Sequence, residues 1–192
     1  YSASFFTDPR LCGVFGKDFP EEYLDILKNR RIDIEGVARE EGKTFYWEGR
    51  YEEDVNVRTT LVTELNVLET FNPVLPDSYR DSKYLFLANI DPDLQLLVLD
   101  QCDKHEFAIA DTMNLWIDIK RDSLQKVLDR VDAVLINDEE ARMLCGTTNL
   151  LKAARMILQG KTRLVIVKKG EHGAMMVTRD NVFFLPGFPL IP

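Results

Sequence analysis

Two polar clusters in the second half of the chain contain the residues best suited to chemistry. The first, residues 137–140 (NDEE), directly follows the apolar run 133–136. The second, residues 168–173 (KKGEHG), directly follows the apolar run 164–167. In open α/β sheets, buried parallel strands that deliver polar or glycine-rich segments at their carboxyl ends form ligand sites. The two clusters therefore indicate a ligand site at one edge of a sheet.

Each cluster also has a purely structural interpretation. Asn137 precedes a helical pattern and Glu140 follows three positions later, so the pair could form a capping box and nothing more. Gly170 and Gly173 are spaced so that the backbone can approach a ligand closely, but the same spacing also suits a plain turn between strands. The residues alone leave both alternatives open.

Four apolar runs separated by helical patterns predict a parallel sheet. The expected strands are residues 84–88, 107–110, 133–136 and 164–167, and the expected helices are 91–101, 122–130, 138–145 and 149–159. Strands and helices that alternate at this spacing imply right-handed crossovers and a sheet covered on both faces. The carboxyl ends of these strands would then meet at one edge, together with the polar residues that follow them: Asn89, Asp111, Asn137 and Lys168.

The first third of the chain has a different pattern. Pro20, followed by two glutamates, predicts a helix that ends near Arg30. From residue 36 to 65 the helical periodicity disappears, and β-branched and aromatic residues between turn signals predict a short antiparallel patch. So thin a sheet has no core of its own, so its large apolar side chains must cover something unless the patch is a plain surface hairpin. These side chains are Phe45, Tyr46, Trp47 and Leu61.

The order of these motifs resembles that of the ribokinase-like carbohydrate kinases, the PfkB family, in which Asn-x-x-Glu precedes a strand and a Gly-x-x-Gly turn. Residues 11–19 resemble that family's strand and turn entering a helix, residues 31–37 the stretch leading into its lid, and residues 111–114 its Asp-x-x-Asn-like loop. The resemblance extends along most of the chain. It implies an α/β fold with a three-layer core and a mostly parallel sheet, built from residues 1–35 and 66–192, and a small β-sheet lid at 36–65.

The resemblance also implies an activity: ATP-dependent transfer of the γ-phosphoryl group to a hydroxyl of a sugar or nucleoside. On the nucleotide side it implies four residues, Asn137, Lys168, Gly170 and Gly173. Because Mg²⁺ dehydrates reluctantly, Glu140 would hold water bound to the metal rather than the metal itself. Lys168 stands where many relatives have Thr, and it could either contact phosphate or point into solvent.

For the sugar or nucleoside, the resemblance implies contacts from Asn89, Asp111 and Asn114. Asp111 could instead cap the loop that follows it. The lid would contact the substrate or a second subunit, which makes a homodimer through the lid one expected partner arrangement.

Both ends of the sequence suggest that it is a piece of a longer protein. Tyr1 begins inside a helical pattern, and Pro192 closely follows a strand-like segment at 182–185. By resemblance, an opening strand would precede Tyr1, and a glycine-rich loop with the catalytic base would follow Pro192. No catalytic residue is therefore assigned within the sequence, and we expect these 192 residues alone to be inactive.

Composition excludes several other classes of protein. The net charge is −8 and no segment is rich in Lys or Arg, so nucleic-acid binding is not expected. No signal peptide is visible in these residues and no apolar stretch reaches the roughly 18 residues that a membrane helix needs, so we expect a soluble, cytoplasmic protein. The three cysteines, Cys12, Cys102 and Cys145, lie among apolar residues and are expected to be buried free thiols.

Two other functions compete with the kinase. A non-catalytic module that binds a sugar or a nucleotide could use the same scaffold, because fold alone does not determine function. A dinucleotide-dependent oxidoreductase is less favoured, because no Gly-x-Gly-x-x-Gly segment follows an early strand.

Overall fold

The computed structural model describes residues 1–51 and 58–188. The chain forms two compact units, Tyr1–Arg80 and Asp81–Pro192. The predicted grouping of residues 1–35 with 66–192 into one core stays a prediction. Among the described residues, no helix combines the length and the apolarity that crossing a bilayer requires.

The first unit contains two small sheets. Strands β1 and β2 pair in parallel, and strands β3 and β4 pair antiparallel. The elements of this unit are η1 (Ser2–Phe5), β1 (Arg10–Phe15), α1 (Glu21–Asn29), β2 (Asp33–Arg39), β3 (Tyr46–Tyr51), β4 (Arg58–Glu64), η2 (Asn66–Leu68) and α2 (Asp77–Arg80). The predicted antiparallel pair therefore exists as β3–β4, and the expected N-terminal helix is a single 3-10 turn, η1.

The start of the predicted antiparallel segment belongs to a different sheet. Residues 36–39 lie in β2, where they pair in parallel with β1 from Cys12 to Phe15. Gly36 allows this close approach, because a Cβ there would lie 2.7 Å from the Tyr79 ring and 2.9 Å from the carbonyl oxygen of Leu11. The expectation of an antiparallel patch that begins at residue 36 was therefore wrong for its first four residues.

The β3–β4 pair packs one aromatic ring against its own backbone. The register of the two strands shifts between Glu48 and Gly49, and a Cβ at Gly49 would overlap the Trp47 ring. The ring is thereby half-buried, whereas Phe45 and Leu61 stay exposed at 41% and 50%. The predicted contact of this pair with a substrate or a second subunit stays a prediction.

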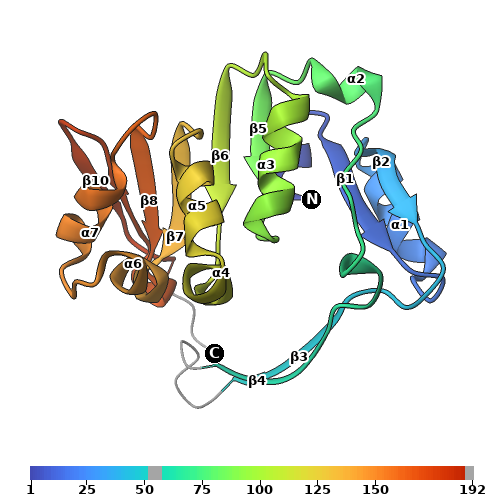
Figure 1. The fold of residues 1–192 in the computed structure, drawn as a ribbon, viewed down its shortest axis with the longest axis horizontal. Coiled ribbons are helices and arrows are strands. Elements are labelled where there is room, and N and C mark those ends of the chain that lie inside the picture. The colour runs from blue at the N-terminus through green and yellow to red at the C-terminus, as the bar shows by residue number, and fades with distance from the viewer. Residues whose placement is uncertain (52–57, 189–192) are drawn as a thin grey trace. The chain divides into compact units, whose positions relative to one another are not determined.

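The second unit is built on one six-stranded sheet (Figure 1). Its strand order is β10-β9-β8-β7-β6-β5; β5 to β8 are parallel, and β9 and β10 are antiparallel to their neighbours. The elements are β5 (Tyr84–Leu87), α3 (Pro92–Gln101), β6 (Phe107–Asp111), α4 (Asn114–Ile119), α5 (Arg121–Leu128), β7 (Ala133–Asn137), α6 (Asp138–Cys145), α7 (Leu150–Ile157), β8 (Leu164–Lys168), η3 (Gly170–His172), β9 (Ala174–Val177) and β10 (Val182–Leu185). The expected mostly parallel sheet is confirmed.

The helices of this unit form one layer. Helix α3 contacts α5, α5 contacts α4, α4 contacts α6, and α6 contacts α7, as expected for a layer on one face of the sheet. The expected helical cover of the opposite face is not formed by the described residues of this unit, and Tyr84 and Phe86 of β5 are exposed. Helix α4 was not predicted: the segment from Asp111 to Asn114 was expected to be a loop, and Asn114 is instead the first residue of this short helix.

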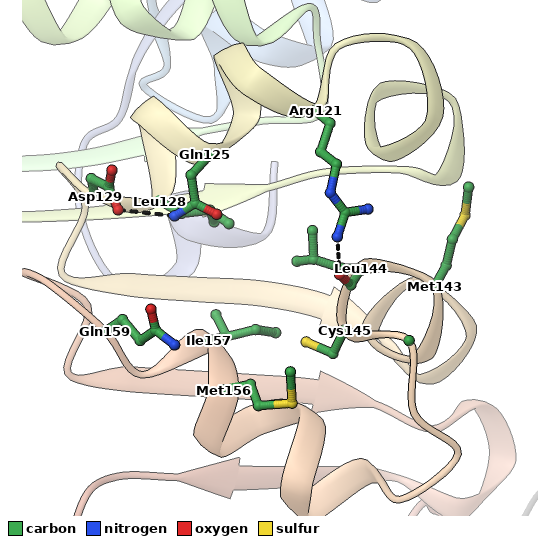
Figure 2. Close-up of a pocket in the computed structure, with 11 residues that line it drawn as sticks. Arg121, Gln125, Leu128, Asp129, Met143, Leu144, Cys145, Met156, Ile157 and Gln159 are labelled. Atoms are coloured by element: carbon green, nitrogen blue, oxygen red, sulfur yellow. Dashed lines mark hydrogen bonds between the residues drawn. The ribbon is translucent and has the colours of Figure 1, made fainter.

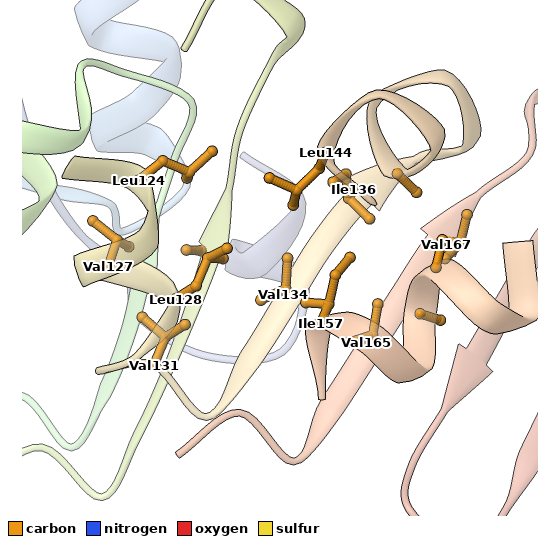
Figure 3. Packing of buried hydrophobic residues seen from close by; sticks show 14 of the residues in the cluster. Leu124, Val127, Leu128, Val131, Val134, Ile136, Leu144, Ile157, Val165 and Val167 are labelled. Carbon is orange, nitrogen blue, oxygen red and sulfur yellow. The ribbon is translucent and has the colours of Figure 1, made fainter. Parts of the chain in front are cut away.

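The core of the second unit lies between these helices and the sheet (Figure 3). Along β7 and β8, alternate residues are fully buried by the helices, as expected for strands with one face against a helical layer. Val134, Ile136, Val165 and Val167 are each at most 1% exposed and meet Leu124 and Ile157 from the helices. This packing holds the strand ends, where the predicted site residues lie, on a rigid support.

A buried hydroxyl group, that of Thr162, holds the loop before β8 against the segment that follows α5. Thr162 is fully buried, and its Oγ1 lies 2.8 Å from the carbonyl oxygen of Leu128 and 3.2 Å from that of Val131, so its single O–H is shared between two acceptors. Buried carbonyl groups that lose their donor carry the full cost of desolvation.

Replacing Thr162 by Val keeps the shape and removes the donor. We expect the free energy of unfolding to fall by about 1–3 kcal/mol, because the buried carbonyls lose the one donor that they share. Urea titration of Thr162→Val against Thr148→Val, which makes the same change at an exposed position, measures the effect. Equal stability of the two variants would contradict this account.

Candidate functional site

Four polar residues stand at the carboxyl edge of the parallel strands. Asp111, Asn137 and Lys168 are the last residues of β6, β7 and β8, and Asn89 lies two positions beyond β5. Because β5 to β8 are parallel and adjacent, these residues share one edge of the sheet. The expected convergence is therefore present in the structure, while the role of each residue in ligand binding stays a prediction.

Lys168 forms an ion pair across this edge. In the register of the sheet it lies opposite Asn137, and its Nζ lies 3.3 Å from Oδ1 of Asp111, two strands away. The two side chains are 43% and 19% exposed, so the pair is worth at most about 1 kcal/mol to stability. Of the alternatives left open by the sequence, Lys168 therefore does not simply point into solvent: it spans the edge between two predicted subsites.

Asn137 and Glu140 form a reciprocal capping box at the start of α6. The backbone N–H of Glu140 donates to Oδ1 of Asn137 at 2.8 Å, and the backbone N–H of Asn137 donates to Oε2 of Glu140 at 2.9 Å. The box satisfies two orphan donors of the helix, as the structural interpretation of the motif expects. A ligand role for the same pair is compatible with this geometry, because each side chain keeps a polar atom outside these two bonds.

The carboxyl group of Glu140 is buried, with only 7% of the residue exposed. Burial raises the pKa of Glu140, although the N–H of Asn137 and the nearby charge of Lys168 act in the opposite direction; Asp111 and Glu139 raise the pKa further. A nearby cation stabilises the charged form of such a buried acid, which burial alone disfavours. The chemistry at this point therefore fits a hydrated divalent cation beside Glu140.

The described residues contain no cluster of three or more His, Cys, Asp or Glu side chains arranged to hold a metal ion. Mg²⁺ is commonly bound through one or two carboxylates plus substrate phosphates and keeps several waters. Glu140 and Asp111, which lie close enough to influence each other electrostatically, match that sparse arrangement. If Mg²⁺ binds here, its charge would screen phosphates from these two carboxylates.

The predicted substrate side is formed by two loops that are tied together. Oδ1 of Asn89 accepts a hydrogen bond from the indole N–H of Trp116 at 2.9 Å, and its Nδ2 lies 3.3 Å from the sulfur of Met113. Asn114 is exposed at the start of α4, where its Oδ1 accepts from the N–H of Leu115. Asn89 is thus fixed to the α4 segment, whereas the amide nitrogen of Asn114 has no hydrogen-bond partner among the described residues.

The predicted Gly-x-x-Gly turn is packed against another segment of the chain. Gly170 and Gly173 have φ angles of +55° and +86°, and the N–H of Lys169 donates to the carbonyl oxygen of Gly173 at 2.8 Å. A Cβ at Gly173 would overlap the backbone of residues 185–187, and a Cβ at Gly187 would overlap the carbonyl oxygen of Glu171. Packing of backbone on backbone therefore already requires glycine at position 173; a nucleotide contact there stays a prediction.

Sequence reasoning missed one residue of this edge, Gln95. It lies on α3 and is 1% exposed, and its amide nitrogen bonds carbonyl groups at the ends of β5 and β6. The available signal was its position: Pro92, Gln95 and Leu99 are the buried residues of α3, spaced as one face of a helix. A lone amide on an otherwise apolar face indicates a specific buried partner.

A hollow of about 490 Å³ lies elsewhere, between α5 and the ends of α6 and α7 (Figure 2). Apolar and sulfur-containing side chains line it together with the guanidinium group of Arg121, which donates to the carbonyl oxygen of Leu144. None of the predicted site residues lines this hollow. The candidate site is therefore the carboxyl edge of the sheet, where the polar groups converge.

Solved structures with the same architecture are ribokinase-like kinases. A putative ribokinase II from E. coli, solved in complex with ATP and Mg²⁺, matches with a TM-score of 0.81 and 16% identity over 98% of this chain and 65% of that chain. A nucleoside kinase of the ribokinase family from Methanocaldococcus jannaschii matches with a TM-score of 0.73 and 18% identity over 95% of this chain and 60% of that one. The fold is thus ribokinase-like.

The model of the pfkB family of carbohydrate kinases matches residues 2–191, and the chain belongs to this family. The resemblance seen in the sequence is confirmed. Among characterised proteins, a cytidine kinase from Thermococcus kodakarensis is 29% identical over 180 residues, which cover 92% of this chain. The chain spans 63% of the length of that relative.

The raised pKa of Glu140 makes a prediction about pH. The folded protein holds this proton more tightly than the unfolded chain, so the stability that Glu140 contributes is fully present below the ordinary carboxyl pKa, about 4, and is lost as the pH rises through the raised folded value. Glu140→Gln keeps an acceptor for the N–H of Asn137 but does not titrate. We therefore expect the unfolding free energy of the native protein to fall relative to that of Glu140→Gln as the pH rises from about 4.

Urea unfolding at a series of pH values measures this difference. Glu22→Gln, which removes the same charge from an exposed position in the first turn of α1, is the control for the change in net charge. Parallel stability curves for the native protein and Glu140→Gln would refute the assignment of a buried, cation-seeking carboxyl group.

Proposed function

We propose that the complete protein is an ATP-dependent kinase that transfers the γ-phosphoryl group to a hydroxyl of a nucleoside or sugar. The observation that carries the proposal is the arrangement at the carboxyl edge, in a chain of the pfkB family: a buried capping-box carboxylate, a lysine and a second carboxylate lie side by side. A cytidine kinase among its relatives favours a nucleoside as the first acceptor to test.

In this proposal the residues divide between two subsites. Asn137, Lys168 and the turn from Gly170 to Gly173 bind the nucleotide, and Asn89, Asp111 and Asn114 bind the acceptor. Lys168 offers three N–H donors, of which the ion pair with Asp111 uses one, so the ammonium can also bond a phosphate oxygen. ATP and Mg²⁺ supply the transferable group and neutralise the charge that develops on it.

Glu140 holds water of the magnesium shell in this proposal. Its carboxyl group is buried at the sheet edge, and its charged form needs a nearby cation. In the complete enzyme, Glu140→Gln should therefore raise the Mg²⁺ concentration required for half-maximal rate and lower turnover, by roughly tenfold if one charge-assisted contact is lost.

Initial rates measured over a range of Mg²⁺ concentrations test the role of Glu140. Glu22→Gln again serves as the control, and its magnesium dependence should match that of the native enzyme. If Glu140→Gln also kept the native rate and magnesium dependence, capping alone would account for the motif.

The proposal also makes a prediction about residues 1–192 taken alone. The family resemblance assigns no general base within them, and loss of a general base typically lowers the rate by roughly 10²–10⁴-fold. Assays of ATP turnover with cytidine, other nucleosides and free sugars should show activity for a version extended at both ends and a rate at least about 10²-fold lower for these residues alone. Equal rates would show that the catalytic residues lie within the 192 residues.

A further inference from the structure

Gln95 cross-links the ends of two strands from inside the core. Its Nε2 lies 2.9 Å from the carbonyl oxygen of Ala88, 3.0 Å from that of Asp111 and 3.3 Å from that of Leu87. The carbonyl groups of Leu87 and Ala88 lie at the end of β5, and that of Asp111 lies at the end of β6. A primary amide has two N–H groups, so they are shared among three acceptors.

These bonds begin where the strand ladder stops. The last paired residues of β5 and β6 are Leu87 and Ala110, so the backbone of Ala88 and Asp111 lies just beyond the ladder between these two strands. At this point the chain leaves the sheet in two loops, one toward α3 and one toward α4. Gln95 thus supplies the connection that the backbones no longer make.

The side chains on these two loops belong to the proposed acceptor subsite. Asn89 directly follows Ala88, and Asp111 is itself one of the bonded residues. A second tie lies outside the core, where the indole N–H of Trp116 donates to Oδ1 of Asn89. The buried amide and the indole together fix the separation between Asn89 and Asp111.

We infer that Gln95 is a positioning residue for the acceptor: it holds Asn89 and Asp111 at the spacing at which both can bond hydroxyl groups of one substrate molecule. The inference rests on the proposed function. A polyol bound by two groups loses affinity when their spacing changes, because errors of about 1 Å already weaken or misalign hydrogen bonds. The nucleotide subsite at β7 and β8 depends on this amide less directly: neither strand bonds to it, and the one link is the partly exposed ion pair of Lys168 with Asp111.

Gln95→Met in the complete protein tests the inference, because it preserves side-chain length and removes both donors. We expect the KM for the acceptor to rise by roughly tenfold, while the KM for ATP stays within about twofold. Gln101→Met makes the same change on the same helix, at a side chain that donates to the carbonyl oxygen of Leu97, and should leave both constants unchanged. Equal rises of both KM values, or unchanged values in a less stable protein, would overturn the inference.

Trp116→Phe provides a second variant in case Gln95→Met does not fold. It leaves the core amide in place and removes only the tie to Asn89, so the acceptor KM should rise by a few-fold with the ATP KM unchanged. An unchanged acceptor KM in this variant would also count against the inference.

Hydrogen exchange separates this inference from the proposed function. In Gln95→Met, amides in peptides covering residues 85–91 and 109–115 should exchange faster than in the native protein and in Gln101→Met, whether or not the protein phosphorylates anything. If no acceptor is phosphorylated and these peptides still exchange faster, the proposed function fails while the cross-link stands. Unchanged exchange in both peptides would show that Gln95 does not hold the strand ends.

Discussion

Parallel pairing of four apolar strands is the constraint on which the rest of this structure depends. Because β5 to β8 all run in one direction, every chain segment that leaves the sheet toward a helix begins at the same edge. Polar groups concentrated there need partners wherever the packing of helices and sheet buries them. The capping box of Asn137 and Glu140, the pair of Lys168 and Asp111, and the amide of Gln95 are three different solutions to that requirement.

The sequence predicted the elements that follow from local periodicity and failed where distant segments decide. The four parallel strands and helix 138–145 were predicted correctly, since apolar runs and a capping box are local signals. Helix α4 was missed because a segment of six residues between two polar segments is too short to show helical periodicity. Residues 36–39 were assigned to the wrong sheet because their partner, β1, lies far back in the chain.

The same distinction applies to the candidate site. The positions of Asn137, Asp111 and Lys168 at the strand ends could be predicted, because they follow from where the apolar runs stop. The pairing of Lys168 with Asp111 could not be predicted, because it joins residues fifty-seven positions apart across an intervening strand. Gln95 was missed for a related reason: its partners are backbone carbonyls, which every residue possesses and no sequence pattern marks. Charge balance at this edge is equally a property of the folded chain, since Lys168 faces two acidic groups at once.

The interlocked glycines at 173 and 187 limit what comparison of related sequences can teach about this protein. A side chain at either position would meet backbone atoms, which cannot rotate away as a side chain can, and no substitution at one position relieves the obstruction at the other. Natural selection would therefore keep Gly173 even in a descendant that had lost every affinity for nucleotide. Invariance at this position would therefore record the geometry of the chain rather than the binding of a ligand.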